Sequence, residues 1–364
     1  MPTVSLLTGK PRGVSPTLPG LPQGMAPATF ISTHQTGMTE PGIHWTANYK
    51  LPTADSSPAM FSEATPSTRL RDLTALIGEI ADLKRIRTAG SSHSLATRLF
   101  SRAWEALIAG EPLEKVALHI SATAVTGARL GGIDADVLRG AGLGEHQVLE
   151  VLRRAFDEVA GALPPALAMS LRAQLGEPLR ASARPPRFVE LLAGQPRAGA
   201  TKPGQPRLIL DPTENHADHS LGVAVNAVLL APIYDAQPAE AFFAGLIHHL
   251  QNAGFPDAGF AGEALLGEHL ATVFRAYREA SMAEVPEELH PLAKRLVRET
   301  EQPQTPASRA FNAADVLDRV LQQQWHARAA AFTLEHAMDE MEIVHAGPVQ
   351  AFHHDVLREA GLMR

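Results

Sequence analysis

The sequence predicts an all-α protein, a bundle of helices, and three observations support this fold class. From Arg69 onward apolar residues recur every three or four positions, which is the spacing of one helix face; the first of them are Leu70, Leu73, Leu76, Ile77, Ile80 and Leu83. Alanine-rich strings such as residues 327–331 favour helix. The sequence holds no convincing run of alternating apolar and polar residues, which is the pattern of a strand.

Three segments are expected along the chain. Residues 1–66 are rich in Pro, Ser, Thr and Gly and lack periodicity, which is typical of a flexible tail. Apolar residues such as Trp45 leave open the alternative that this tail wraps the folded body. Periodicity also breaks between Gly194 and Gly204, around Pro196 and Pro203, and this break separates a helical domain at 67–194 from a second helical domain at 205–364.

Glycine and proline residues bound the individual helices. Beyond the first helix, the first domain is expected to hold helices at 94–109, 113–129, 145–160 and 165–175. The second domain is expected to hold helices at 215–230, 238–253, 262–280, 287–299 and from 313 into the 340s. The glycines at 140–144 suit a helix end and a turn better than a phosphate-binding loop, because no predicted strand precedes them.

Composition excludes several classes of protein. The chain of 364 residues has no cysteine, which rules out disulfides, thiolate nucleophiles and thiolate zinc sites. A net charge of -7 gives no reason to expect nucleic acid as a partner, and the longest apolar runs are too short to span a membrane. The first residues lack the pattern of a secretory signal. We expect a cytoplasmic protein that acts on a small molecule, and assembly into a homo-oligomer stays open.

The distribution of histidine is the main indication of function. Most of the 16 histidines follow Asp211, and several lie within apolar helical segments. His216 and His219 are three residues apart, so both can point to one side of a helix. An apolar helix then carries His248 and His249, and other possible ligands follow at Asn252, Asp257, Glu263 and His269. Imidazole and carboxylate groups of this kind suit first-row divalent metals without any sulfur ligand.

Residues 215–322 resemble the HD-domain superfamily of metal-dependent enzymes, in which successive helices supply a His, a His-Asp pair and a later Asp. His219 corresponds to the first element, His248 in the string AGLIHHLQNAG to the second, and Asp315 in AADVLDRVL to the last. The departure is His249, which takes the place of the family's Asp, a residue that often bridges two metals. Glu263 or Asp257 would then have to supply the missing carboxylate. His269 or His290 would stand in for the additional histidines of members with two metals.

The resemblance implies a metal-dependent enzyme that most often hydrolyses a phosphate ester of a small molecule. It also allows a di-iron oxygenase, or a module that has lost its chemistry and serves binding or regulation. The implied metal ligands are His219, His248, His249, Glu263, His269 and Asp315. Iron and manganese are the expected metals, and zinc and nickel are also compatible with these ligands. The arginines and lysines of the second domain show no diagnostic spacing and do not separate these functions.

A rival metal site lies in the last part of the chain. Glu335, Asp339, Glu342 and His345 recur at helical spacing, and Glu342-x-x-His345 is the ligand pair of ferritin-like di-iron bundles. Such bundles need a second copy of the pair, which the sequence does not contain. A solvated acidic face on a surface helix is the simpler interpretation.

Overall fold

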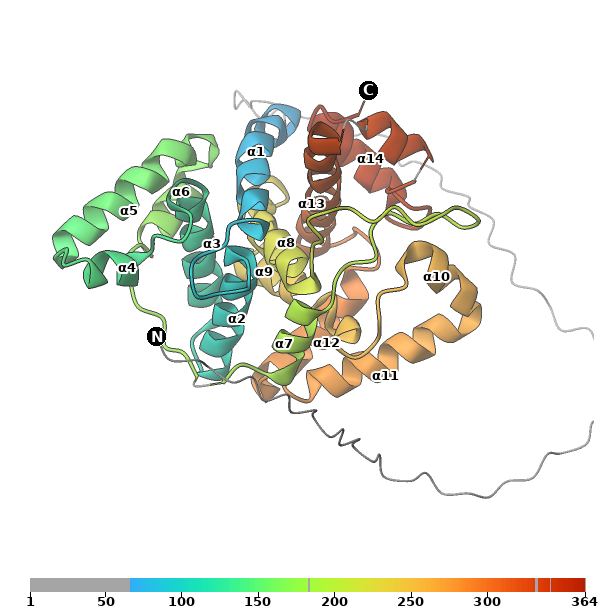
Figure 1. Cartoon of the computed structure of the whole chain (residues 1–364), viewed down its shortest axis with the longest axis horizontal. Coiled ribbons are helices and arrows are strands. Elements are labelled where there is room, and N and C mark those ends of the chain that lie inside the picture. The colour runs from blue at the N-terminus through green and yellow to red at the C-terminus, as the bar shows by residue number, and fades with distance from the viewer. Residues whose placement is uncertain (1–65, 183, 331–332, 341, 364) are drawn as a thin grey trace, which may run out of the picture. The chain divides into compact units, whose positions relative to one another are not determined.

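All regular structure in the described chain is helical, as the sequence predicts (Figure 1). The computed structural model describes residues 66–182, 184–330, 333–340 and 342–363. The tail predicted at 1–66 falls outside this part of the chain, except for Pro66, at which α1 begins. Two isolated β-bridges, Pro196 with Asn215 and Ala200 with Leu208, are the only extended pairings among the described residues.

The helices follow one another with short connections, several of which are 3₁₀ turns. They are α1 Pro66–Ala81, α2 Leu95–Ile108, α3 Leu113–Leu130, α4 Ala135–Gly140, α5 Glu145–Val159, α6 Pro165–Arg172, α7 Arg187–Gly194, α8 His216–Leu230, α9 Pro238–Ile247, α10 Gly259–Leu266, α11 Leu270–Met282, α12 His290–Glu299, α13 Pro306–Ala330 and α14 Gln350–Glu359.

The predicted helices are present, and the structure corrects several of their limits. Ser94 caps α2 by accepting a hydrogen bond from the backbone N–H of Thr97 at 2.8 Å, which explains why that helix starts where polar residues give way to apolar ones. The helix predicted at 262–280 is two helices, α10 and α11, because Gly267 takes a positive φ of 51° between them. Helices α4, α7 and α14 were not predicted.

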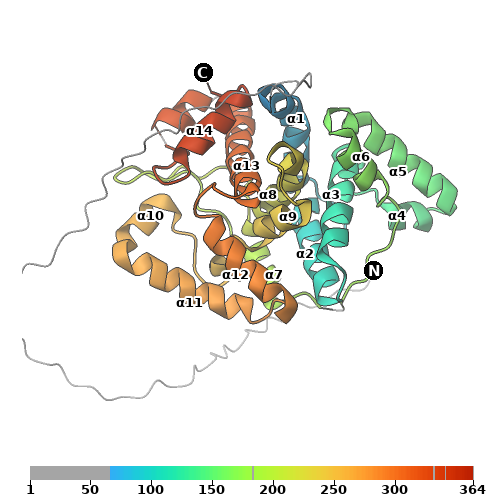
Figure 2. The same ribbon diagram turned by 180° about the vertical axis from the view of Figure 1, so that it is seen from behind.

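Helix α8 forms the centre of the hydrophobic core. Every residue of α8 is buried, and α1, α2, α3, α7, α9 and α13 all contact it (Figures 1 and 2). Because these neighbours come from both sides of residues 194–205, the two predicted domains share one core within the described chain. A shared core does not mark a division at that point, and the two-domain division stays a prediction.

The closest helix contact brings α8 against α9. A Cβ atom built on Gly245 of α9 would lie 2.5 Å from the backbone N of Ala224 in α8, so only glycine allows this approach. The contact places the end of α9, with the two histidines that follow it, beside the first turns of α8.

No helix in the described ranges is long and apolar enough to cross a membrane.

Substitution of Gly245 tests this contact. We expect Gly245→Ala to lower the free energy of unfolding by roughly 1–3 kcal/mol, because the added methyl group forces α8 and α9 apart. Urea unfolding followed by circular dichroism measures the change. Gly78→Ala in α1 is the matched control: nothing lies within 4 Å of its added methyl group, so the variant should gain about 0.5–1 kcal/mol from helix propensity. Equal stability of the two variants would contradict the tight contact.

Candidate metal centre

The centre is built on the first turn of α8. Asn215 caps this helix, and its side-chain oxygen accepts a hydrogen bond from the backbone N–H of Asp218 at 2.7 Å, which satisfies a donor that every helix start leaves free. The cap fixes where α8 begins and so determines the side to which His219 points. The His219 imidazole is fully buried and contacts side chains from the end of α9 and from α13.

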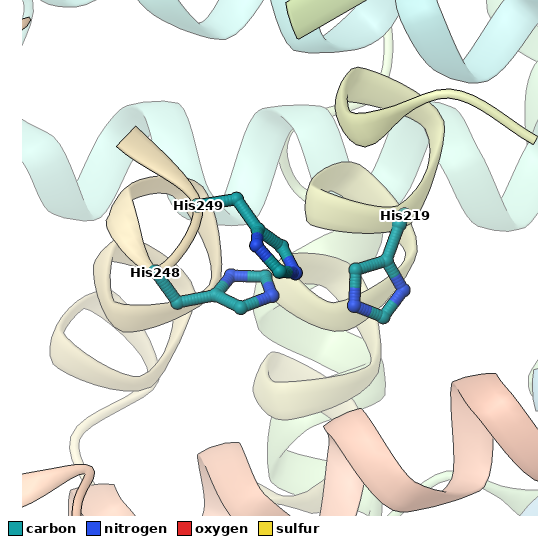
Figure 3. A group of neighbouring side chains, drawn as sticks. All are labelled: His219, His248 and His249. Carbon is teal, nitrogen blue, oxygen red and sulfur yellow. The ribbon is translucent and has the colours of Figure 1, made fainter. Parts of the chain in front are cut away.

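His248 and His249 follow α9, and their rings lie beside the ring of His219 (Figure 3). Adjacent residues on a regular α-helix point about 100° apart, but α9 ends at Ile247 and the chain passes into a 3₁₀ turn, Leu250–Ala253. Ring centroids lie 4.1 Å apart for His248 and His249, and 5.1 and 5.2 Å from each of these to His219. One nitrogen of each ring lies within 4.8 Å of the others. The three imidazoles therefore share one space.

Hydrogen bonds assign the same tautomer to all three rings. The Nδ1 atom of His219 lies 2.7 Å from Asp318 Oδ2, that of His248 2.7 Å from the Gly245 carbonyl, and that of His249 2.9 Å from Asn252 Oδ1. Each of these partners is an acceptor, so each Nδ1 carries the hydrogen and donates it. The lone pair of each ring is then on Nε2. Metal-binding histidines are oriented in this way by acceptors behind the ring.

Asp315 of α13 faces the same space. Its Oδ1 atom lies 3.2 Å from His219 Nε2, without the geometry of a hydrogen bond. With the hydrogen of His219 on Nδ1, two atoms that both carry lone pairs face each other in a buried position. The Nε2 atom of His248 is also buried and has no hydrogen-bond partner. Either a metal ion or a second proton on His219 would remove the conflict with Asp315.

Burial keeps the imidazoles of His248 and His249 neutral, whereas neighbouring groups keep the Asp315 carboxylate charged. Burial, followed by the neighbouring His219, lowers the pKa of His248 from 6.5 to about 3. Burial and the adjacent His248 hold the pKa of His249 well below its ordinary value. Burial alone would raise the pKa of Asp315, but Arg319 and His219 outweigh it and hold that pKa well below its usual range. Two neutral imidazoles and one charged carboxylate thus face this space at neutral pH.

Arg197 contacts the third imidazole. Its Nη1 atom lies 2.7 Å from His249 Nε2, and because a guanidinium only donates, the lone pair of His249 accepts this bond. A metal ion on His249 would need the same lone pair. Arg197 reaches the centre because its backbone N–H donates to the Glu214 carbonyl at 2.8 Å, which ties the segment after α7 to the residues before α8.

A second group of possible ligands shares His219 with the first. Glu214, His219 and Asp318 bring one oxygen or nitrogen atom each within 4.8 Å of the others. The ammonium group of Lys84 already contacts two members of this group. Lys84 Nζ lies 2.6 Å from Glu214 Oε1 and 2.6 Å from Asp318 Oδ2.

A cavity of about 310 Å³ opens beside the imidazoles. His248, His249 and Asp315 line it, together with Arg197 and Arg319. The aromatic rings of Phe260, Phe274 and His345 also line it. This volume lies at the lower end of the range for sites that bind small molecules. The cavity therefore combines metal-binding, cationic and aromatic groups.

The structure brings together four of the six predicted ligands: His219, His248, His249 and Asp315. Glu263 lines the same cavity without joining this group, and burial, with Asp257 nearby, raises its pKa. His269 lies apart from this group: its side chain is 77% exposed on the turn between α10 and α11, and it does not line the cavity.

The substitutes considered for the missing carboxylate and histidines have other partners. Asp257 accepts hydrogen bonds from two backbone N–H groups, those of Ala198 and Gly259, at 2.8 Å each. It also lies 3.4 Å from His216 Nε2. His290 bonds through Nε2 to the Val285 carbonyl at 2.9 Å. These contacts hold loops and turns in place.

The predicted ligands do not include Asp318, Arg197 and Lys84, which contact the imidazoles directly or through a carboxylate. Asp318 could have been found, because it follows Asp315 by three positions and so shares a helix face with it. Arg197 and Lys84 give no local signal: Arg197 meets His249 across 52 positions of sequence, and Lys84 meets Asp318 across 234.

The rival acidic site near the C-terminus is not assembled among the described residues. Glu335 and Asp339 are exposed. Glu342 is also exposed and forms an ion pair with Lys202 at 2.9 Å. The His345 ring stacks on Phe260 at a centroid distance of 4.2 Å. His345 thus belongs to the cavity beside the imidazoles.

Removal of one imidazole tests the centre. We expect His248→Ala to weaken Zn²⁺ binding by about 100-fold or more, because loss of a ligand should exceed the roughly 10–100-fold typical when a ligand's hydrogen-bond partner is removed. Competition with a chromophoric chelator measures the affinity. His269→Ala is the matched control, since its exposed ring lies outside the cavity, and it should bind Zn²⁺ like the wild type. An equal loss in both variants would place the metal elsewhere.

The depressed pKa of His248 also predicts a pH dependence of the metal-free protein. The unfolded chain takes up this proton near pH 6.5, whereas the native state does so only near pH 3. Stability should therefore fall as pH drops between these values. From pH 7 to pH 5, His248→Gln should lose up to about 2 kcal/mol less than the wild type. Urea unfolding in the presence of a chelator measures this, and parallel curves over that range would contradict the assignment. Between pH 7 and 8 the two proteins should change alike.

Comparison with known proteins adds no relative. No family model, curated protein or solved structure matches the chain. The resemblance to the HD-domain superfamily therefore rests on the residues named above and stays a prediction. What the geometry establishes is a buried set of imidazole and carboxylate groups that could hold a metal ion.

Proposed function

We propose that the protein is a metal-dependent enzyme of the HD-domain type that hydrolyses a phosphate ester of a small molecule. One observation carries this proposal. The three imidazoles of the centre each donate Nδ1–H to an acceptor behind the ring, which leaves their Nε2 lone pairs in one space beside Asp315.

A metal ion explains this arrangement better than a proton. A second proton on His219 would satisfy the contact with Asp315 and nothing more. It would leave the buried Nε2 atom of His248 without a partner. A cation accepts several lone pairs at once, so it can satisfy His219, His248 and Asp315 together.

The ligand set narrows the choice of metal. Imidazole nitrogens with one carboxylate oxygen suit iron, manganese, zinc and nickel, whereas magnesium and calcium prefer oxygen alone. A bound metal of this kind would lower the pKa of a water molecule and polarise the phosphoryl oxygens. Residues of the protein would bind the phosphate group.

Arg197 and Arg319 would hold the phosphate. Both guanidinium groups line the cavity that contains the imidazoles. Arg319 contacts Asp315 Oδ2 at 3.1 Å, and its buried Nε has no hydrogen-bond partner. Metal binding to His249 would release Arg197 from the imidazole, because one lone pair cannot serve both. The released guanidinium would then be free to bind an anion.

A binding or regulatory module without a metal is the second candidate, and one observation favours it. Arg197 already occupies the lone pair of His249 at 2.7 Å. This histidine stands where the HD-domain resemblance places an Asp. If Arg197 stays in place, three of the four ligands of the centre remain for a metal: His219, His248 and Asp315.

Metal content and hydrolysis distinguish the two candidates. We expect protein purified without chelators, or loaded anaerobically with Fe²⁺ or Mn²⁺, to retain metal and to cleave members of a phosphomonoester and phosphodiester panel. Arg319→Gln should lower kcat/KM by about 10–100-fold, because it removes a charged hydrogen bond to the phosphate.

Arg298→Gln is the control for that variant, since Arg298 is exposed on α12 outside the cavity. It should leave kcat/KM unchanged. Plasma mass spectrometry on each protein separates loss of metal from loss of phosphate binding. A wild-type protein that binds none of the four metals would overturn the enzyme proposal in favour of the binding module.

A further inference from the structure

Lys84 is buried between two carboxylates of the second ligand group. Its side chain is 2% exposed, and Nζ lies 2.6 Å from both Glu214 Oε1 and Asp318 Oδ2. Burial alone would lower the pKa of the ammonium group, but the two carboxylates outweigh it and raise that pKa above its ordinary value. Lys84 is therefore a charged group in a position where a metal ion would meet the same oxygens.

We propose that the ammonium group of Lys84 occupies the cation position of the group formed by Glu214, His219 and Asp318, and so limits the centre to one metal ion. The inference deepens the proposed function, since it rests on a metal bound by the other group. It also assigns Lys84 a positioning role, because Asp318 Oδ2 accepts from both Lys84 Nζ and His219 Nδ1.

The charge of Lys84 explains how the shared carboxylate can orient His219. Asp318 is fully buried, and an isolated carboxylate in that position would be costly. With the ammonium group 2.6 Å away, Asp318 can stay ionised and accept the Nδ1–H of His219. The His219 lone pair then points away from the second group, toward Asp315 and the other imidazoles. The resident cation in one group thus prepares the neighbouring group for metal.

Gly222 supplies independent support. It lies inside the buried helix α8, three positions after His219, where glycine is unfavourable for helix stability. A Cβ atom at this position would overlap Asp318 Oδ1 and would lie 3.1 Å from Lys84 Cε. The sequence therefore leaves room in α8 for this lysine and this aspartate to meet.

Lys84 also connects the two halves of the chain. It ends the 3₁₀ turn Asp82–Lys84 that follows α1, whereas its partners precede α8 and lie on α13. The N-terminal helical region therefore contributes a charged side chain to the centre. Metal binding by the C-terminal half is expected to depend on it.

Metal stoichiometry tests the proposal, with Mn²⁺ as the probe and the full chain as the protein. After anaerobic loading and desalting, plasma mass spectrometry should find about one equivalent in the wild type and about two in Lys84→Met, in which the vacated carboxylates bind a second ion. Lys84→Met/Glu214→Gln has one carboxylate fewer in this group and should return to about one equivalent. Circular dichroism of each variant checks the fold.

The outcomes separate this inference from the proposed function. Two equivalents in the wild type would overturn the inference, whether or not the variants fold. One equivalent in a folded Lys84→Met protein would also overturn it. No metal in the wild type but one equivalent in Lys84→Met would support Lys84 as the resident cation while overturning the metal-dependent enzyme. No metal in either protein would overturn both.

Discussion

The close approach of α8 and α9 is the constraint on which the centre depends. Gly245 lies against the backbone of Ala224, so the two helices meet without intervening side chains. The same glycine offers its carbonyl to His248 Nδ1 at 2.7 Å. One residue therefore both positions α9 against α8 and orients the imidazole that α9 carries. A larger residue at this position would disturb the distance between His219 and His248 as well as the core.

The core around α8 contains more charge than a purely structural core needs. Lys84, Asp318 and His219 are all buried and in mutual contact through one carboxylate. Replacement of a buried ion pair by well-packed apolar residues is often neutral or stabilising, whereas removal of one partner commonly costs about 3–5 kcal/mol. Stability alone therefore gives little reason for this network. Orientation of the His219 imidazole, which could hold a metal ion, gives a direct one.

Lys84 and Arg197 affect the metal-binding capacity of the imidazoles in different ways. Lys84 contacts carboxylates, so it adds to the charge balance behind His219 and leaves the imidazole lone pair free. Arg197 contacts the lone pair of His249 itself and competes with any metal there. A centre with a permanent cation in one group and a displaceable one in the other suits a single metal ion and an anionic ligand. If Lys84 holds the second group, as proposed, one metal ion remains, whereas a di-iron oxygenase would need two.

The sequence by itself determined the all-α fold, most of the helices, the placement of His219 and Asp315 on two of them, and that of His248 directly after a third. These features follow from the 3.6-residue period of the helix, which is a local property. The tertiary structure decided the rest. It set apart His269, which is as good a ligand by type as its neighbours but is exposed and does not line the cavity. It brought in Lys84 and Arg197, which no local pattern marks, because contacts between distant segments depend on how helices pack and where turns point.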